Sequence, residues 1–396
     1  MSRATPRIVI ATRLYAPEVG AASFRLRALA RGLAASGATV RVVTTTPPPG
    51  SAPEPVDPGV STARASVLRD AGGNVRGYVQ YLSFDIPLFF RLLFARADLV
   101  VSEPPPTTGL VVAVTSWLHR RPYVYYAADV WTDGLIALGA PKPVVAVMRR
   151  VEGFVMRRAA AVIAVSDEVA EKVRSFGVAG DRVSSIGNGV DTEVFRPDGP
   201  VADTVSPTFV YTGAMSEWQG PTVFVEAMPR ILEEYPTANI QFFGQGVEEP
   251  AIRATAERLG LTSVHVRGVI PPAETAQWIR GATAALASIR PGVGYDFAKP
   301  TKTYAAAACG TPVVFAGIGV GAQLVEENDL GWRAAFEPAA VADAMLAAVR
   351  AEEGGQSALS SAARVAWVRS NASIAATGHR AAEVVLDALR SRSRAR

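Results

Sequence analysis

The sequence predicts an α/β protein made of two Rossmann-like domains in tandem. In both halves of the chain, short apolar runs alternate with stretches of helical periodicity, and this alternation starts again after residue 207. Short buried strands that alternate with helices are typical of a parallel sheet with helices on both faces. The chain has 396 residues, which is enough for two domains of ordinary size.

The composition is that of an ordinary globular protein. Hydrophobic residues make up 49% of the chain and charged residues 19%, and the net charge of +4 gives no support to a nucleic-acid partner. The single cysteine, Cys309, leaves no disulfide framework and indicates a reducing compartment. The histidines are scattered along the chain, so we expect no zinc site.

The amino-terminal segment does not resemble a secretory signal. Only residues 8–11 form an apolar run between Arg7 and Arg13. No window of the sequence holds the roughly 20 apolar residues that span a membrane. We therefore expect a cytoplasmic protein.

Apolar runs in the first half of the chain predict strands, and helical spacing predicts the helices between them. The predicted strands are residues 7–12, 39–45, 97–102, 123–126, 160–165 and 183–186. The predicted helices are residues 23–36, 74–96, 108–119, 144–158 and 166–175. Ser166 is expected to cap the last of these helices. Residues 47–58 are rich in proline and predict an exposed loop.

The helix predicted at residues 74–96 is mostly apolar and is punctuated by arginines. Pro87 should kink or divide this helix, because proline removes a hydrogen bond and crowds the preceding turn. The helix either covers the sheet as a buried element or forms an amphipathic surface that rests on lipid headgroups.

Two loops follow predicted strands of the first half. Residues 15–22 bring small residues to the start of a helix, where backbone N–H groups can approach a phosphate, but the GxGxxG spacing of dehydrogenases is absent. Residues 127–133 contain Asp129 and Asp133, whose spacing is not that of a metal-binding DxD motif. Asp129 is either a ligand-facing carboxylate or a residue that caps a helix or bonds between domains.

The second half repeats the alternation after a polar, proline-containing linker at residues 198–207. The predicted strands are residues 208–212, 239–243, 264–270, 282–289, 313–315 and 331–333. The predicted helices are residues 222–235, 250–259, 305–308, 341–350 and 362–389. We therefore expect a first domain at 1–197, a second domain at 208–361 and a carboxy-terminal helical segment at 362–396.

Residues 288–317 predict a strand end, a loop, a short helix and another strand. The loop carries Lys299, Pro300, Thr301 and Lys302 directly before the helix. Helix amides that open beside lysines at the carboxyl end of a parallel sheet form an anion pocket. The alternative is an ordinary strand–loop–helix unit that binds no ligand.

Two segments resemble a known family. KPTKTYAAAACGTPVV at 299–314 is similar to the donor site of family 4 glycosyltransferases, which are retaining enzymes of the GT-B fold, and NGVDTEVFRP at 188–197 is similar to their interdomain passage. The Pro-Thr-Lys form is closest to a fucosamine-transferase-like branch that acts in bacterial surface-polysaccharide synthesis. The resemblance implies two Rossmann-like domains facing a central cleft, with the last helix crossing back to the first domain.

The resemblance also implies an activity. It is the transfer of a sugar from a nucleotide diphosphate donor, most commonly a UDP-sugar, to an acceptor hydroxyl with retention of anomeric configuration. No metal or other cofactor is required in that family. The acceptor would be a lipid-linked glycan or a small molecule, and a lipid-linked acceptor would bring the protein to the inner face of the membrane.

Individual residues take roles from the same resemblance. Lys302 would grip the leaving phosphate, and Asp129 would face the acceptor or a sugar hydroxyl. The implied donor-binding residues are Gly20, Ala21, Gly213, Gln219, Gly244, Val269, Arg290, Lys299, Pro300 and Thr301. Arg290 and Lys299 are the members of this set that could instead be simply solvated.

Three positions depart from the family pattern. Ala214 and Gln219 stand where the family has an arginine and a lysine, and Ala305 stands where it has the glutamate that holds the ribose. These departures support a second hypothesis, a GT-B pseudoenzyme that binds a nucleotide or a partner without turnover. A third hypothesis, a nucleotide-sugar epimerase of the same architecture, would be expected to show carboxylate and histidine pairs that we do not find.

Overall fold

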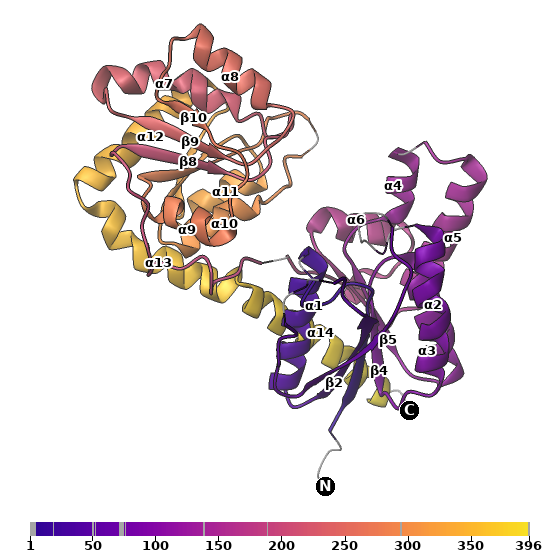
Figure 1. Cartoon of the computed structure of the whole chain (residues 1–396). Coiled ribbons are helices and arrows are strands. Elements are labelled where there is room, and N and C mark those ends of the chain that lie inside the picture. The colour runs from indigo at the N-terminus through magenta and orange to yellow at the C-terminus, as the bar shows by residue number, and fades with distance from the viewer. Residues whose placement is uncertain are drawn as a thin grey trace. The chain divides into compact units, whose positions relative to one another are not determined.

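A computed structural model describes residues 5–394 except 19, 50, 52, 71–74, 76, 138, 188 and 294. Its internal contacts divide the chain into two compact units (Figure 1). Unit 1 comprises Met1–Asn188 together with Ile374–Arg396, and unit 2 comprises Gly189–Ser373. Each unit contains one parallel sheet with helices packed on it, as the alternating pattern predicts.

The sheet of unit 1 has the strand order β3-β2-β1-β4-β5-β6-β7, and all its pairs are parallel. Its strands are β1 (Arg7–Ala11), β2 (Thr39–Thr45), β3 (Val60–Ala65), β4 (Leu99–Ser102), β5 (Tyr123–Ala127), β6 (Ala161–Ala164) and β7 (Val183–Ser185). The central strands are apolar and buried because helices cover both faces of the sheet. Strand β3 was not predicted, since this half-exposed edge strand lacks an apolar run.

Two layers of helices cover this sheet. They are α1 (Ala21–Ala35), α2 (Tyr78–Leu93), α3 (Pro106–Leu118), α4 (Trp131–Ala137), α5 (Lys142–Arg158), α6 (Asp167–Ser175) and α14 (Ile374–Arg394), with a short 3₁₀ turn at Gly180–Arg182. One core cluster joins α1 and α14 to the sheet, and another joins α2, α3 and α5 to it. Ser166 caps α6 as predicted, because its hydroxyl accepts a hydrogen bond from the amide of Val169 at 3.2 Å.

Helix α2 is buried on one side and exposed on the other, so it covers the sheet as the first alternative predicted for residues 74–96. It runs as one helix through Pro87, so the proline does not divide it. Phe84, Leu88 and Leu92 are buried against the sheet, whereas other large apolar residues of α2 are exposed. Residues 74 and 76 of the predicted segment lie outside the described residues.

The sheet of unit 2 has the order β10-β9-β8-β11-β12-β13 and is also parallel. Its strands are β8 (Thr208–Thr212), β9 (Asn239–Phe243), β10 (Val264–Val266), β11 (Ala284–Ser288), β12 (Val313–Ala316) and β13 (Gly331–Ala334). Its helices are α7 (Thr222–Glu234), α8 (Glu249–Arg258), α9 (Pro272–Arg280), α10 (Thr301–Ala308), α11 (Val320–Glu327), α12 (Pro338–Glu353) and α13 (Gln356–Asn371).

The chain passes from unit 1 to unit 2 earlier than residue 197. Val190 is buried in the core of unit 2, its amide donates to the carbonyl of Ala372 at 2.8 Å, and Phe195 packs on the same core. The segment predicted as 362–396 is not one helix, because α13 ends at Asn371 in unit 2 and α14 begins at Ile374 in unit 1. No helix in the described part of the chain is both long and apolar enough to cross a membrane.

Helices α1 and α14 approach closely because each carries a glycine at the contact. A Cβ atom built on Gly378 would lie 2.5 Å from the backbone carbonyl of Ala28, and one on Gly32 would lie 2.7 Å from the carbonyl oxygen of Gly378. Both distances are far below van der Waals contact, so a side chain would force the helices apart.

We expect Gly378→Ala to lower the free energy of unfolding by about 1–3 kcal/mol, because overpacking outweighs the better helix propensity of alanine. Urea unfolding followed by circular dichroism measures the change. Gly134→Ala in α4 is the matched control, since no atom lies within 4 Å of its added Cβ. Equal stability of the two variants would contradict the close contact.

Candidate functional site

The predicted lysine of unit 2 lies at the start of α10. Pro300 precedes this helix, and Lys302 occupies its first turn. The Lys302 side chain turns inward, so its Nζ lies 3.4 Å from the ring centroid of Tyr211 and 3.4 Å from Oε1 of Gln219. The sequence predicted Lys302 as a site residue, but it gave no sign that Tyr211 on β8 would lie beneath the ammonium group.

The ammonium end of Lys302 is buried without a negatively charged partner among the described residues. The residue as a whole is half-buried, but protein surrounds its ammonium end, and this burial lowers the pKa of Lys302 well below its ordinary value. Its polar partner is the neutral amide of Gln219, and among the described residues no carboxylate lies within ion-pair distance of it. A buried charge is normally paired, so this position favours an anionic ligand.

Gln219 is buried beside this ammonium and does not replace the missing family lysine. Its Oε1 lies 2.7 Å from the hydroxyl of Tyr211, which also lies 2.9 Å from the carbonyl oxygen of Ala214. The Tyr211 hydroxyl has one proton and donates to one of these oxygens at a time. Gln219 therefore holds the Lys302 and Tyr211 side chains in register rather than supplying charge.

Two glycine loops pack against each other at the ends of β8 and β9. Gly213 and Gly244 both have positive φ angles, of 95° and 142°. A Cβ on Gly244 would collide with the carbonyl oxygen of Gly213, so only glycine fits at this position. Gly213 is exposed at the carboxyl edge of the sheet, whereas Gly244 is buried against it.

The remaining predicted donor residues of unit 2 are less closely grouped. Arg290 follows β11, and its Nη2 lies 3.7 Å from Oε1 of Glu248, so part of its charge is already matched. Val269, Lys299 and Thr301 are exposed, and Pro300 is buried. Ala305 is buried in the core of unit 2, so its methyl group fills a packing position.

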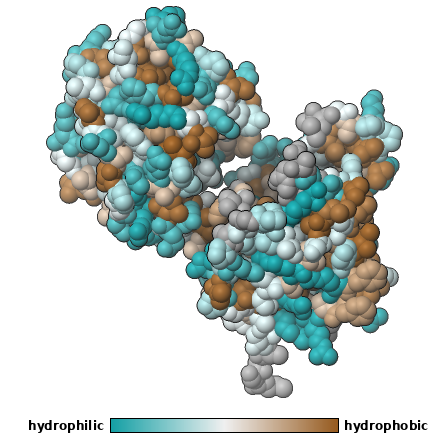
Figure 2. Space-filling view, viewed as in Figure 1, coloured by the Kyte–Doolittle hydropathy of each residue, from teal (hydrophilic) through white to brown (hydrophobic). Residues whose placement is uncertain are grey.

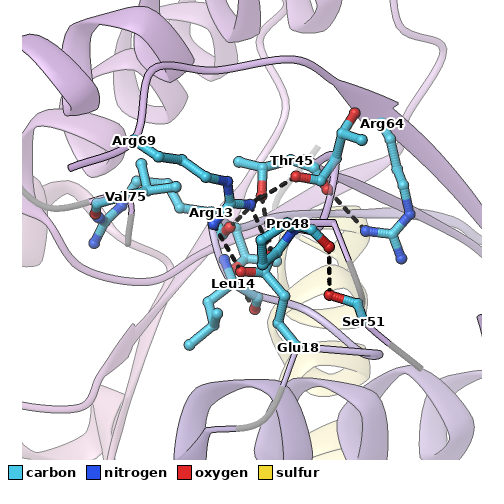
Figure 3. Close-up of polar contacts among 11 residues, drawn as sticks. Arg13, Leu14, Glu18, Thr45, Pro48, Ser51, Arg64, Arg69 and Val75 are labelled. Carbon is cyan, nitrogen blue, oxygen red and sulfur yellow. Dashed lines mark hydrogen bonds and ion pairs between the residues drawn. The ribbon is translucent and has the colours of Figure 1, made fainter. Parts of the chain in front are cut away.

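In unit 1, Gly20 and Ala21 lie at the start of α1, after the loop that follows β1. Side chains from distant parts of the sequence hold this loop (Figure 3). Arg69 forms an ion pair with Glu18 at 2.9 Å and donates to the hydroxyl of Thr45 at 3.2 Å. Arg64 donates to the carbonyl of Ala16 at 2.6 Å. The residue between Glu18 and Gly20 lies outside the described residues.

A buried ion pair lies behind this loop and was missed by the sequence analysis. Arg25 of α1 lies 3.1 Å from Glu103, which follows β4, and both side chains are almost fully buried. Thr12 donates to the same carboxylate at 2.6 Å. Burial raises the pKa of Glu103, and the charge of Arg25 opposes that rise. The signal in the sequence was a glutamate directly after an apolar strand, where ligands or buried networks are expected.

Asp129 follows β5 at the same edge of the sheet. Its side chain is exposed on one side, while burial on the other side raises the pKa of Asp129 against the opposing charges of Arg25 and Arg13. Asp129 forms no hydrogen bond within the described residues. We therefore find its carboxylate available for a ligand.

Helix α4, which begins after Asp129, is capped by another residue. The buried Glu152 of α5 accepts hydrogen bonds from the amides of Trp131 at 2.8 Å and Thr132 at 3.0 Å. Glu152, and not Asp129, is thus the cap of this helix. Asp133 is also engaged, because it forms an ion pair with Lys172 at 2.9 Å.

Both units match known glycosyltransferase domains. Residues 20–189 match a glycosyl transferase 4-like domain, and residues 206–351 match a domain of the glycosyl transferases group 1. Each match falls mainly within one unit of the structure.

Curated relatives cover part of the chain. D-inositol 3-phosphate glycosyltransferase 2 of Catenulispora acidiphila is 30% identical over 50% of this chain and 51% of its own length. The corresponding enzyme of Frankia alni is 29% identical over 39% of this chain and 41% of its own length. The chain thus matches about half the length of these relatives or less, and they are named for inositol phosphate rather than for fucosamine.

Solved structures share the fold over nearly the whole chain. Anabaena HepE in complex with UDP has a TM-score of 0.63 at 16% identity, covering 97% of this chain and 100% of that one. A glycosyltransferase of Rickettsia africae has a TM-score of 0.69 at 13% identity, with coverage of 98% and 100%. The fold is wider than one activity, since a putative UDP-N-acetylglucosamine 2-epimerase of Listeria monocytogenes also matches, with a TM-score of 0.54 at 11% identity over 99% of this chain and 98% of that one.

The domain matches and the fold matches agree with the two parallel sheets seen here. The chain therefore belongs to the GT-B glycosyltransferases, with a 4-like domain in its first half and a group 1 domain in its second.

Proposed function

We propose that the protein transfers a sugar from a nucleotide diphosphate donor to an acceptor hydroxyl, with retention of configuration. The observation that carries this proposal is the buried ammonium of Lys302, which has no carboxylate partner in the described part of the chain. A diphosphate would supply the missing negative charge. The leaving group of the reaction would then be bound by a lysine that is already positioned before the reaction starts and whose charged form the diphosphate favours.

The neighbouring backbone suits the same ligand. Helix α10 starts beside Lys302, and its first amides have no partner within the helix, which makes helix starts good sites for phosphate. The exposed backbone of Gly213, beside the Lys302 side chain, adds a surface that a phosphate can approach. Arg290, Lys299 and Thr301 would complete the donor site, and the backbone at Val269 would contact the base.

UDP is our proposed nucleotide. HepE, which has the same fold, was crystallised with UDP and with UDP-glucose. In a retaining transfer of this type the departing phosphate accepts the proton of the acceptor hydroxyl, so the protein needs to position and to stabilise rather than to supply a strong base. Gly20 and Ala21 would lie near the diphosphate, and Asp129 would bind a hydroxyl of the sugar or of the acceptor.

We propose two kinds of acceptor, a phosphorylated polyol and a lipid-linked glycan. A phosphorylated polyol is supported by the names of the curated relatives, and a lipid-linked glycan is supported by the resemblance of the Pro300–Lys302 segment to surface-polysaccharide enzymes. Both acceptors fit a cytoplasmic protein, in agreement with a single, buried cysteine.

The pseudoenzyme remains the second candidate, because Ala305 is a core residue and Gln219 is occupied by Tyr211 and Lys302. Two donor contacts of the family pattern are therefore replaced, one by a packed methyl group and the other by an amide that bonds within the protein. A protein that has lost turnover in this way would still bind the nucleotide through Lys302 and the glycine loops.

A donor assay distinguishes the two candidates. The purified chain is incubated with UDP-, GDP- and dTDP-sugars, alone and with myo-inositol phosphate or polyprenyl-linked glycans, and the released nucleoside diphosphate is measured. We expect slow release from one UDP-sugar and faster release with an acceptor. Thermal stabilisation by UDP without release from any donor or acceptor would favour the pseudoenzyme, and the absence of stabilisation by every nucleotide would reject both.

A further inference from the structure

The outer face of α2 carries a continuous apolar stripe. Its residues follow one another at intervals of about one helical turn, so they lie on the same side of the helix. The exposed members are Tyr78, Val79, Leu82, Ile86 and Phe90, followed by Phe94 just after the helix. More than half of each side chain is exposed, and 81% of Phe94 is exposed.

Neighbouring helices extend this apolar surface. Helix α3 packs between α2 and α5, and it exposes 75% of Trp117 together with Val114 and Leu118. Helix α5 adds Val147 and Phe154. In the space-filling view, hydrophobic surface gathers along the side of unit 1 where α2 and α5 lie (Figure 2).

The exposed charged residues of α2, α3 and α5 are all positive. The only carboxylates of α2, α3 and α5 are Asp85 and Glu152, and both are buried, bonded to Thr108 and to the start of α4. The exposed charged residues of these helices are Lys142, Arg149, Arg150, Arg157 and Arg158. We refer to the exposed side of α2, α3 and α5 as the apolar–basic face.

A pocket of about 850 Å³ opens at one end of this face. Its lining contains no carboxylate, and Trp117 and Phe154 form part of its apolar wall. The arginines that line it are Arg120, Arg121, Arg158, Arg182 and Arg392. The pocket adjoins the amino ends of β5 and β6, at Pro122 and Ala160, whereas Asp129 follows the carboxyl end of β5. It is therefore separate from the candidate site.

Arg121 connects the pocket to α2. It is almost fully buried, and its two terminal nitrogens donate to the carbonyls of Ala95 and Leu92 at 3.0 Å each. Its Nε is buried without a hydrogen-bond partner. These two bonds fix the Arg121 guanidinium in the wall of the pocket, where its positive charge can attract a phosphate.

We propose that the apolar–basic face docks unit 1 on a bilayer that contains anionic phospholipids, with a lipid phosphate in the arginine pocket. The stripe of α2 enters the boundary between headgroups and acyl chains, as amphipathic surfaces with aromatic and basic residues do. The arginines are attracted by the negative surface potential. A second copy of this chain is a poor occupant, because a two-fold contact would place the same basic surfaces against each other.

Flotation with vesicles tests the proposal without any sugar donor. We expect the chain to float with vesicles of phosphatidylglycerol and phosphatidylcholine, and not with pure phosphatidylcholine. Ile86→Glu and Phe90→Glu should each reduce partitioning about tenfold or more, because each puts a charge in place of exposed apolar area that the bilayer would bury. The pair Arg158→Ala and Arg392→Ala should reduce it about fivefold per arginine.

Matched controls come from unit 2. Leu359→Glu changes a leucine that is 84% exposed, and Arg369→Ala removes an exposed arginine, so neither should alter flotation. Circular dichroism and melting confirm that each variant is folded. The proposal is overturned if the wild-type chain does not float, if Ile86→Glu floats as well as Leu359→Glu, or if the chain is a dimer that Phe90→Glu separates. Inorganic phosphate binding without flotation would also overturn it.

Discussion

Replacing Lys302 with methionine should lower the rate of UDP-sugar turnover by about 10²–10³, which is the usual cost of removing one pre-oriented group that stabilises a leaving oxyanion. Methionine keeps the length of the side chain and removes its charge. Lys142→Met is the matched control, since Lys142 is an exposed lysine at the start of α5. The measurement is initial-rate release of UDP with and without acceptor.

The same substitution should leave the free protein as stable as the wild type or more stable. Lys302 is buried over Tyr211 without a carboxylate among its described neighbours, so its charge has a desolvation cost that methionine does not have. An inactive but fully stable Lys302→Met would support a functional cation. An active Lys302→Met would reject the proposed role. If Lys302→Met is inactive and unfolded, a structural role could explain the loss. Turnover by Lys302→Arg, which keeps the charge, would then decide between the structural and the functional role.

The pH dependence of UDP binding is a second readout of the same lysine. Burial lowers the pKa of Lys302 in the folded protein, while the unfolded chain keeps the ordinary value of 10.5. Between these two values the unfolded chain binds more protons, so the stability of the free protein rises with pH there. A bound diphosphate favours the charged lysine, so UDP affinity should fall as pH rises through the lowered pKa. In Lys302→Met both dependences should disappear, as titration calorimetry at several pH values can measure.

Much of the fold could be predicted because buried parallel strands are short apolar runs. The strands at 39–45, 208–212 and 239–243 begin and end at the predicted residues. Two of the elements that were missed, β3 and α4, have no local signal of this kind. Strand β3 is a half-exposed edge, and α4 receives its cap from Glu152 on a different helix. Local sequence does not contain partners that lie far along the chain.

The residues of the candidate site also divide into those with a local sequence signal and those without one. Lys302, Pro300 and Thr301 could be found because they form one contiguous segment at a helix start. Their partner Tyr211 could not, since β8 reaches α10 only through the packing of the sheet. The network of Arg25, Glu103 and Thr12 was missed for the same reason, because Arg25 lies within α1 while Thr12 and Glu103 follow two different strands.

The second prediction with a large expected effect concerns the buried network of Arg25, Glu103 and Thr12. Arg25→Met should lower the free energy of unfolding by about 3–5 kcal/mol, because it leaves the carboxylate of Glu103 buried without its ion-pair partner. Arg31→Met on the same helix is the control. Arg31 is 65% exposed and lies 3.8 Å from Asp57, so its removal should cost less than about 1 kcal/mol.

The loss of stability in Arg25→Met should depend on pH in a defined direction. Burial raises the pKa of Glu103 above its ordinary value of 4.5, and removing Arg25 takes away the larger of the two charges that oppose this rise, the other being that of Arg13. Between 4.5 and the raised pKa the folded variant holds more protons than the unfolded chain, so its stability falls as pH rises through that window. The difference between Arg25→Met and wild type should therefore be small near the lower end of the window and full above the raised pKa.

A repair variant separates the loss of the pair from the loss of packing. Arg25→Met combined with Glu103→Leu removes both charges together, and replacing a buried ion pair by apolar groups is often neutral. The double variant should thus recover most of the stability and lose the pH dependence, as urea unfolding at two pH values would measure. Equal losses in the single and double variants would mean that Arg25 acts through its contact with the ring of Tyr126, at 5.0 Å, and not through its pairing with Glu103.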